Sequence, residues 1–312
     1  MKYSSKGNSA LKEGLTAHLL DDVHNRRERF RAEVLQWGQK HMRQYPWRTP
    51  GRTPYETLIA ETLLKRTTAT AAARVYEDFL HRFPHLQAIN DASKEELAQA
   101  LSKVGLQWQR AKAIKALAHY LREVQGGEIP SDLHRLIDVP GLGEYSARAI
   151  LSFGFGIPIA IVDTNVERIL ARVFQNVLPQ KPPQYLFQEL ANSLVPSKSH
   201  GKYNLGLLDL GALICRYIDP LCEECPLASI CDYYSRNRGR LIKEEPGRYE
   251  TNIGLKLRRV REKKGIGLTK LSQLSGVSKL TIIRIESGKT SPRTETIGKL
   301  AAALEVEPDR LR

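Results

Sequence analysis

The sequence predicts an all-α protein in two domains, and two observations carry that prediction. From Phe30 to Arg238, apolar residues recur at helical spacing almost throughout, and no pair of alternating strands joined by a hairpin turn is present. The C-terminal fifth of the chain is also helical in its periodicity and has a small apolar core pattern of its own. A length of 312 residues with 41% hydrophobic content suits about two packed domains.

Four segments are expected in order. Residues 1–28 are polar and predict a flexible lead-in, 29–238 the first domain, 239–251 a charged linker with proline and glycine, and 252–312 the second domain. Thr53-Pro54-Tyr55-Glu56 is a capping box with proline at the first helical position, so a helix begins there. The helices of the first domain are expected at about 54–66, 68–82, 93–102, 109–125, 133–138, 144–154, 164–174, 184–195 and 203–215.

Charge is unevenly distributed along the chain. The formal net charge is +14, and residues 251–312 alone hold 14 Lys and Arg against 6 Asp and Glu. This excess favours a polyanionic partner, and nucleic acid over a membrane because no basic amphipathic anchor is evident. The opening MKYSSKGNS lacks the apolar region of a secretion signal, and the longest mostly apolar run, 149–162, is too short to span a bilayer. We therefore expect a cytoplasmic, nucleoid-associated protein.

All four cysteines lie in one short stretch, with the spacing C-x6-C-x2-C-x5-C. Four thiolates at such spacing bind a tetrahedral zinc or an iron–sulfur cluster. Two disulfides are disfavoured because nothing indicates an oxidising compartment. Spacing alone leaves zinc and cluster open for Cys215, Cys222, Cys225 and Cys231.

A proline- and glycine-rich hairpin, Val139-Pro140-Gly141-Leu142-Gly143, joins two of the predicted helices. Pro140 cannot continue a helix, and the two glycines allow positive φ and close backbone approach. The helix that follows Gly143 begins with amides that have no partner inside the helix, which is the basis of an anion site. A DNA phosphate would suit it without sequence preference, whereas the alternative is a plain turn between helices.

Two further motifs follow the hairpin: E-Y-S-A directly after it and V-D-T-N-V-E-R about twenty residues on. Together with the cysteine spacing, they resemble the helix-hairpin-helix DNA glycosylases of the endonuclease III and MutY superfamily, over roughly residues 30–235. The resemblance implies a two-lobed all-α fold with an active-site cleft between the lobes. It also implies a [4Fe–4S] cluster rather than zinc on the four cysteines.

The resemblance places a catalytic carboxylate at Asp163. Cleavage of an N-glycosidic bond builds positive charge on the sugar, which a fixed carboxylate stabilises, or the carboxylate activates water. Asp163, or a Thr164-x-x-Glu167 capping box, is also suited to begin the next helix, and capping and catalysis are compatible roles. Glu61 matches a functional glutamate of MutY-like members, which implies that it protonates or hydrogen-bonds the departing base. From position alone, Glu61 reads as a solvated residue at the edge of an apolar stripe.

Tyr145 occupies the place where the bifunctional endonuclease III type carries a lysine that forms a Schiff base with the sugar. Tyrosine has no amine, so we expect base removal without strand cleavage. Tyr145 together with L-L-K-R-T-T-A resembles the thymine/guanine mismatch glycosylase branch. The alternative for Tyr145 is an ordinary amphipathic aromatic on a helix face.

Side chains commonly fill the gap that a base leaves when it is extruded from the duplex. Arg66 matches a wedge glutamine of the family and Leu106 a wedge leucine, although a core role for Leu106 is the alternative. We also expect the cysteine loop to present basic residues, such as Arg236 and Arg238, to phosphate.

Residues 252–312 resemble the Cro/repressor type of helix-turn-helix, with Gly276 at the tight turn, a recognition helix at about 278–287 and a further helix near 294–304. A Ser/Thr–Gln phosphate contact common at the start of the second helix is replaced by Gly267-Leu268. The residues expected to face the major groove or flanking phosphates are Ser278, Lys279, Thr281 and Arg284, and the expected core is Leu271, Leu274, Val277, Ile282 and Ile285. A helical dimerisation module, giving a homodimer through the C-terminal domain, is the alternative.

The leading hypothesis is a monofunctional glycosylase that removes thymine or uracil opposite guanine from double-stranded DNA, with a second DNA contact through the C-terminal domain. A MutY-like adenine glycosylase is the alternative of the same class. A transcriptional regulator built on a glycosylase fold is the alternative of another class, and the presence of both Glu61 and Asp163 argues against it, since a pure binder needs neither.

Overall fold

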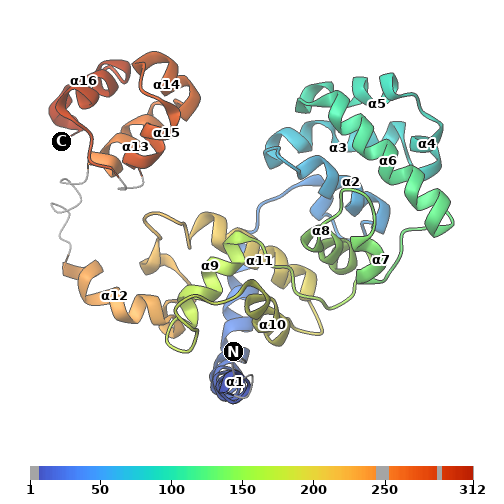
Figure 1. The fold of residues 1–312 in the computed structure, drawn as a ribbon, viewed down its shortest axis with the longest axis horizontal. Helices are drawn as coiled ribbons and strands as arrows, with labels where there is room; N and C mark the ends of the chain where they lie inside the picture. The colour runs from blue at the N-terminus through green and yellow to red at the C-terminus, as the bar shows by residue number, and fades with distance from the viewer. Residues whose placement is uncertain (1–6, 244–252, 287–289, 312) are drawn as a thin grey trace, which may run out of the picture. The chain divides into compact units, whose positions relative to one another are not determined.

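The computed structural model describes residues 7–243, 253–286 and 290–311. The chain divides into two compact units, Met1–Tyr234 and Ser235–Arg312, each of which is considered by itself. The described residues form helices and turns and contain no strand, so the all-α prediction is confirmed for them (Figure 1). None of these helices combines the length and the apolar character that crossing a membrane requires.

The first lobe of the N-terminal unit is one continuous stretch of chain. Its core joins Leu58 and Leu63 to Tyr76, Leu97 and Ile114, all of them almost fully buried. The helices that contribute to this lobe are α2 (Pro54–Leu64), α3 (Ala69–Arg82), α4 (Leu86–Asp91), α5 (Lys94–Ala100), α6 (Gln107–Gln125), α7 (Leu133–Ile137) and α8 (Glu144–Ala149), which continues as a wider turn over Ile150–Gly154.

The second lobe combines the two ends of this unit. Helix α1 (Gly7–His41) packs on α11 (His200–Leu213), so segments far apart in the sequence share one core. The other helices of this lobe are α9 (Thr164–Val173) and α10 (Gln184–Leu194), followed by the cysteine loop and the start of α12 (Asp232–Lys243). The first lobe is therefore inserted between two parts of the second.

The expected lead-in at 1–28 differs from the structure. Helix α1 already begins at Gly7, and Leu19 and Val23 are buried in the core of the second lobe. The Arg26 guanidinium donates to the carbonyl oxygens of Val173 and Ile230, at 3.0 and 2.9 Å. In this polar segment, sparse apolar residues at helical spacing form a stripe that continues to Phe30, and the composition alone did not indicate it. Residues 1–6 lie outside the described residues.

The other expected helices of this unit are present with small shifts at their ends. The predicted capping box is confirmed: the Glu56 amide donates to Thr53 Oγ1 at 3.2 Å, and the Thr53 amide donates to the Glu56 carboxylate at 2.7 Å. The short helix α4 was not expected. The expected linker at 239–251 begins as helix, because α12 extends to Lys243, and residues 244–252 lie outside the described part.

The C-terminal unit is a small bundle of α13 (Ile253–Lys263), α14 (Leu268–Ser275), α15 (Lys279–Glu286) and α16 (Thr294–Ala303). Gly276 ends α14 with a φ of +68°, a conformation that glycine adopts without strain, which confirms its predicted place in the turn. The core contains Leu271, Ile282 and Ile285, with Val277 packed against it. Leu274, also expected in the core, is 51% exposed, so that assignment is wrong.

Candidate active site

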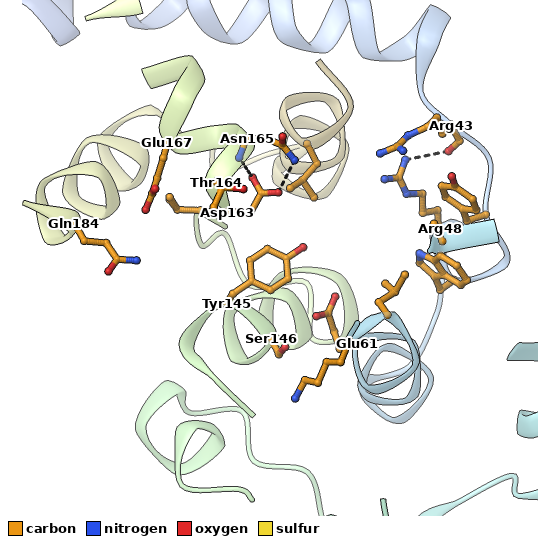
Figure 2. A pocket seen from close by; sticks show the side chains of 17 residues that line it. Arg43, Arg48, Glu61, Tyr145, Ser146, Asp163, Thr164, Asn165, Glu167 and Gln184 are labelled. Atoms are coloured by element: carbon orange, nitrogen blue, oxygen red, sulfur yellow. Dashed lines mark hydrogen bonds between the residues drawn. The ribbon is translucent and has the colours of Figure 1, made fainter. Parts of the chain in front are cut away.

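A cleft of about 590 Å³ opens between the two lobes of the N-terminal unit (Figure 2). Helices α2 and α8 line it from the first lobe, and the start of α9 and one residue of α11 line it from the second. The segment 43–48, which lies between α1 and α2, lines it as well. The three residues that the sequence assigned to catalysis, Glu61, Tyr145 and Asp163, all line this cleft although they lie on three different helices or helix ends. The predicted cleft between two lobes is therefore present.

Asp163 is the N-cap of α9, and its carboxylate is held by three hydrogen bonds. Oδ1 accepts from the backbone amides of Asn165 and Val166 at 2.9 and 2.8 Å, and Oδ2 accepts from the Asn165 side-chain amide at 2.8 Å. The capping role is thus confirmed for Asp163, and its catalytic role stays a prediction, whereas Thr164 is the first helical residue and not the cap of a box. The cap fixes a negative charge, half-buried, at the edge of the cleft (Figure 2).

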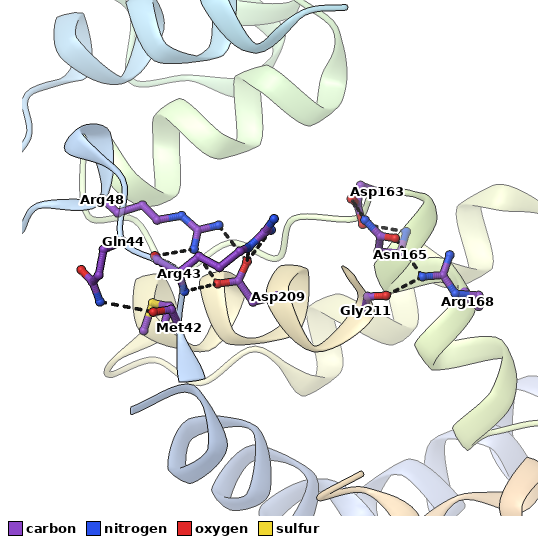
Figure 3. A network of polar contacts seen from close by, with 9 residues as sticks. All are labelled: Met42, Arg43, Gln44, Arg48, Asp163, Asn165, Arg168, Asp209 and Gly211. Atoms are coloured by element: carbon purple, nitrogen blue, oxygen red, sulfur yellow. Dashed lines mark hydrogen bonds and ion pairs between the residues drawn. The ribbon is translucent and has the colours of Figure 1, made fainter. Parts of the chain in front are cut away.

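Asn165, which supports Asp163, is itself held by Arg168 (Figure 3). Arg168 Nη2 donates to Asn165 Oδ1 at 2.8 Å and to the Gly211 carbonyl at 2.7 Å, and its Nε donates to the Cys215 carbonyl at 2.7 Å. A Cβ at Gly211 would lie 2.6 Å from Asn165 Cβ, so only glycine allows this approach. Asn165 and Arg168 belong to the V-D-T-N-V-E-R motif, but no role was predicted for either from the sequence.

Glu61 is only 7% exposed on α2, so its interpretation as a solvated edge residue is wrong. Burial raises the pKa of Glu61 to about 7, while a hydrogen bond with the Ser146 side chain and the charge of Lys65 lower it in part. Lys65 follows α2, and its ammonium donates to the Gly141 carbonyl of the hairpin. Burial lowers the pKa of Lys65, and Glu61 opposes that shift.

Tyr145 lies on α8 between the two carboxylates (Figure 2). Burial raises the pKa of the Tyr145 phenol well above its ordinary value, and Glu61 and Asp163 raise it further, whereas Arg48 lowers it. The phenol therefore remains neutral and can donate a hydrogen bond into the cleft.

Arginine and aromatic side chains from the segment before α2 form another wall of the cleft, which the sequence analysis did not find. Arg43 Nε and Arg48 Nη1 donate to the fully buried Asp209 carboxylate at 2.7 and 2.6 Å (Figure 3). Burial alone would raise the pKa of Asp209, but these hydrogen bonds hold it below its ordinary value. The Tyr45 and Trp47 rings stack at 5.0 Å, and the Arg48 guanidinium lies 5.2 Å from the Tyr45 ring centre.

The hairpin lies where α7 and α8 pack together, with Pro140, Gly141 and Gly143 exposed. Gly141 has a φ of +82°, and Gly143 is the N-cap of α8 without a side-chain cap. The predicted phosphate site is thus accessible in its geometry, and its occupancy by phosphate stays a prediction.

The two predicted wedge residues lie at the tips of two loops of the first lobe. Arg66 and Leu106 are exposed and have left-handed backbone conformations, with φ of +54° and +51°. A core role for Leu106 is wrong, since its side chain is 46% exposed. A left-handed residue that is not glycine is strained, which is a common feature of functional positions.

One buried arginine joins these two loops. Arg110, on α6, donates through Nε to the Gly105 carbonyl at 3.0 Å, next to Leu106. Its Nη2 donates to the Lys65 carbonyl at 2.8 Å and to Thr67 Oγ1, on either side of Arg66. Nothing local in the sequence distinguishes Arg110 from the other cations of α6.

The four cysteines line one small cavity in the second lobe, together with Arg172 and tyrosines of α12. Arg172 Nη1 lies 3.3 Å from Cys215 Sγ and also donates to the Arg216 carbonyl at 2.7 Å. Within the described ranges, no three acidic, imidazole or thiol side chains already stand in a metal-binding arrangement. Four thiols that line one cavity beside a cation fit an anionic thiolate cluster in their chemistry.

In the C-terminal unit, two of the predicted DNA-facing hydroxyls serve the helix itself. Ser278 Oγ accepts from the Thr281 amide at 3.1 Å and lies 2.8 Å from Thr281 Oγ1, so Ser278 caps α15 and the Thr281 hydroxyl is paired with that of Ser278. Lys279 and Arg284 are exposed, as predicted. Leu280 and Ile283, which the sequence analysis left unassigned, are 58% and 40% exposed.

The hairpin, the two-lobed fold and the cleft that holds Glu61 and Asp163 define the class of protein. Residues 59–196 match the model of the HhH-GPD superfamily base excision DNA repair proteins, and residues 257–311 match a helix-turn-helix family model. The chain is 34% identical over 219 residues to the thymine/uracil-DNA glycosylase of Methanothermobacter thermautotrophicus, covering 70% of this chain and 99% of that relative. It is 35% identical to the thymine-DNA glycosylase of Aeropyrum pernix, covering 67% and 96%.

Adenine-specific relatives also match, among them the adenine DNA glycosylase of Buchnera aphidicola, at 32% identity over 67% of this chain and 59% of that one. Among solved structures, a thermostable thymine-DNA glycosylase superposes with a TM-score of 0.63 at 33% identity, covering 69% of this chain and 99% of that one. Endonuclease III in a DNA complex, at 23% identity and a TM-score of 0.57, shares the fold.

The chain therefore belongs to the HhH-GPD superfamily of base excision DNA repair proteins. It is a DNA N-glycosylase with a C-terminal helix-turn-helix domain.

Proposed function

We propose that the enzyme is a monofunctional mismatch glycosylase, which hydrolyses the N-glycosidic bond of thymine or uracil opposite guanine. The observation that carries this proposal is Tyr145 between Glu61 and Asp163, at the place where a lysine would supply an amine. Lys65 also lines the cleft, but its ammonium is hydrogen-bonded to Gly141 and faces the charge of Glu61. Relatives that act on thymine or uracil support the choice of base.

In the proposed mechanism, three residues of the cleft have one task each. The Asp163 carboxylate, fixed by its three hydrogen bonds, stabilises the positive charge that develops on the sugar as the bond to the base breaks. Glu61, protonated below its raised pKa of about 7, donates to the departing base. The neutral Tyr145 phenol donates a hydrogen bond between them. A water molecule then adds to the sugar carbon that has lost the base, and its proton passes to the Glu61 carboxylate, which is thereby protonated again.

The preferred base is tested with end-labelled duplexes that carry T·G, U·G, A·G or A·8-oxoguanine. We expect single-turnover excision at T·G and U·G at least about a hundredfold faster than at adenine, because a site that hydrogen-bonds one base leaves polar groups unpaired with another. Faster excision at adenine would place the enzyme with the MutY type and contradict the proposal. No excision in any duplex would favour the regulator.

We further infer that Cys215, Cys222, Cys225 and Cys231 hold a [4Fe–4S] cluster, which would organise the loop that they close. Arg172, beside Cys215, would offset the negative charge of the thiolates. The measurement is the iron, sulfide and zinc content of the purified protein, with four irons per chain expected and little zinc. Cys225→Ser should lower iron and sulfide together. One zinc per chain and no sulfide would overturn the assignment.

Arg66 and Leu106 are proposed to fill the gap left by the extruded base, with Arg110 holding their loops in register. Arg110→Gln should slow excision at a paired T·G about ten- to a hundredfold, because the wedges would no longer offset the cost of unstacking. A target base in single-stranded DNA needs no prying, so its excision should change less than threefold. Arg122→Gln, an exposed arginine of the same helix, is the matched control. An equal loss on both substrates would mean that Arg110 has only a structural role.

The C-terminal unit is proposed to make a second DNA contact that directs the enzyme to particular sequences. Its support is the helix-turn-helix match and the excess of positive charge in residues 251–312. A homodimer through this unit is the alternative proposal.

A further inference from the structure

The exposed face of α15 is unusual in composition. Ile282, Ile285 and Glu286 point into the bundle, Ser278 caps the helix, and the Thr281 hydroxyl pairs with that of Ser278. The side chains that remain on the exposed face are Lys279, Leu280, Ile283 and Arg284. Leu280 and Ile283 are three residues apart, so they are neighbours on the helix surface, with a cation next to each in the sequence.

Two adjacent apolar side chains exposed to water on a helix face gain free energy only when a partner covers them. The cations on both sides of the pair decide which partner fits. Lysine is depleted at the centres of protein–protein interfaces, whereas Lys and Arg beside a reading helix bind phosphates and guanine. The apolar group that the major groove of DNA presents is the C5-methyl of thymine.

We propose that Leu280 and Ile283 contact the C5-methyl groups of thymines in the major groove, while Lys279 and Arg284 bind phosphate or guanine beside them. The inference rests on the proposed DNA contact of the C-terminal unit and deepens it by naming the chemical group that is read. It predicts that the preferred site contains thymine at one or two fixed positions, and that the methyl group itself carries the preference.

The test uses the full chain with Asp163→Asn, so that the bound DNA is not cut. Duplexes of random sequence without a mismatch are first selected for binding to this chain at moderate salt. Sequences that are enriched by this chain, but not by the same chain with Lys279→Ala/Arg284→Ala, are bound through the C-terminal unit. Each thymine of the selected site is then replaced by deoxyuridine, which pairs identically with adenine and lacks only the methyl group. At one or two positions, this replacement by deoxyuridine should weaken binding about three- to tenfold.

The double variant Leu280→Ala/Ile283→Ala, in the same Asp163→Asn chain, should bind the selected site and its deoxyuridine-substituted form equally. Leu274→Ala, which truncates another exposed leucine of the same unit, should keep the discrimination. Enrichment without any thymine–uridine difference would overturn the methyl contact and leave DNA reading intact. No enrichment would overturn both. A loss of self-association in Leu280→Ala/Ile283→Ala, with no change in DNA binding, would assign the face to a second copy of the chain instead.

Discussion

Asp163→Asn should lower the single-turnover excision rate at a T·G mismatch by at least about a thousandfold while leaving DNA binding nearly unchanged. Asparagine is also a good N-cap, so α9 should keep its start and the unit its stability to within a few tenths of a kcal/mol. What is lost is the charge that the three hydrogen bonds hold at the cleft. The measurement compares excision with binding of the same duplex.

Asp132→Asn is the matched control for this variant. Asp132 caps α7 in the same way, accepting from the Arg135 amide at 2.9 Å, but it does not line the cleft. Its excision rate should equal that of the unaltered enzyme. If Asp163→Asn retained a tenth or more of the rate, the carboxylate would not be the group that stabilises the transition state.

Glu61→Gln should lower the excision rate about a hundredfold or more at pH 6, because the amide cannot transfer a proton to the departing base. In the unaltered enzyme, the rate should fall as pH rises through about 7, where the Glu61 carboxyl loses its proton. The variant should lack this fall. Glu167→Gln, another glutamate that lines the cleft, should keep both the rate and its pH dependence. A rate that rises through pH 7 would mean that the ionised carboxylate is the active form.

Glu61→Gln should also stabilise the fold at high pH. The pKa of Glu61 is raised in the folded state from 4.5 to about 7, so the folded state holds a proton that the unfolded chain releases between these values. The buried carboxyl therefore lowers the free energy of unfolding increasingly between pH 4.5 and 7, by roughly 3 kcal/mol above that range. The thermal unfolding temperature of Glu61→Gln should be higher than that of the unaltered protein at pH 8 and equal to it near pH 4. Equal unfolding temperatures at pH 8 would contradict the raised pKa.

The sequence was sufficient for features with a local signal. The capping box at Thr53, the hairpin at Pro140 and the apolar stripe of α9 each appear within a few residues, so the helices and the place of Asp163 could be predicted. Glu61 was found through its motif, but its burial could not be predicted, because the helix face alone suggested an edge residue.

Features that depend on distant contacts could not be predicted. Asp209 meets Arg48 across 161 positions of the sequence, and Arg110 reaches carbonyls more than 40 residues away, with nothing in either neighbourhood to indicate the pairing. Short helices gave a different error. In α14, Leu274 follows the buried Leu271 at helical spacing and is nevertheless exposed. In α15 the apolar residues occupy more than one face, so periodicity could not decide that Leu280 is exposed while Ile282 is buried.

Strand cleavage after base removal tests the monofunctional mechanism most directly. An end-labelled T·G duplex is incubated with the enzyme, and half of each sample is heated in alkali before electrophoresis. Because Tyr145 offers no amine, all cutting should require alkali, which breaks the strand at the abasic site that the enzyme leaves. Cutting without alkali that disappears in Lys65→Met would show that Lys65 forms a Schiff base, and it would contradict the account.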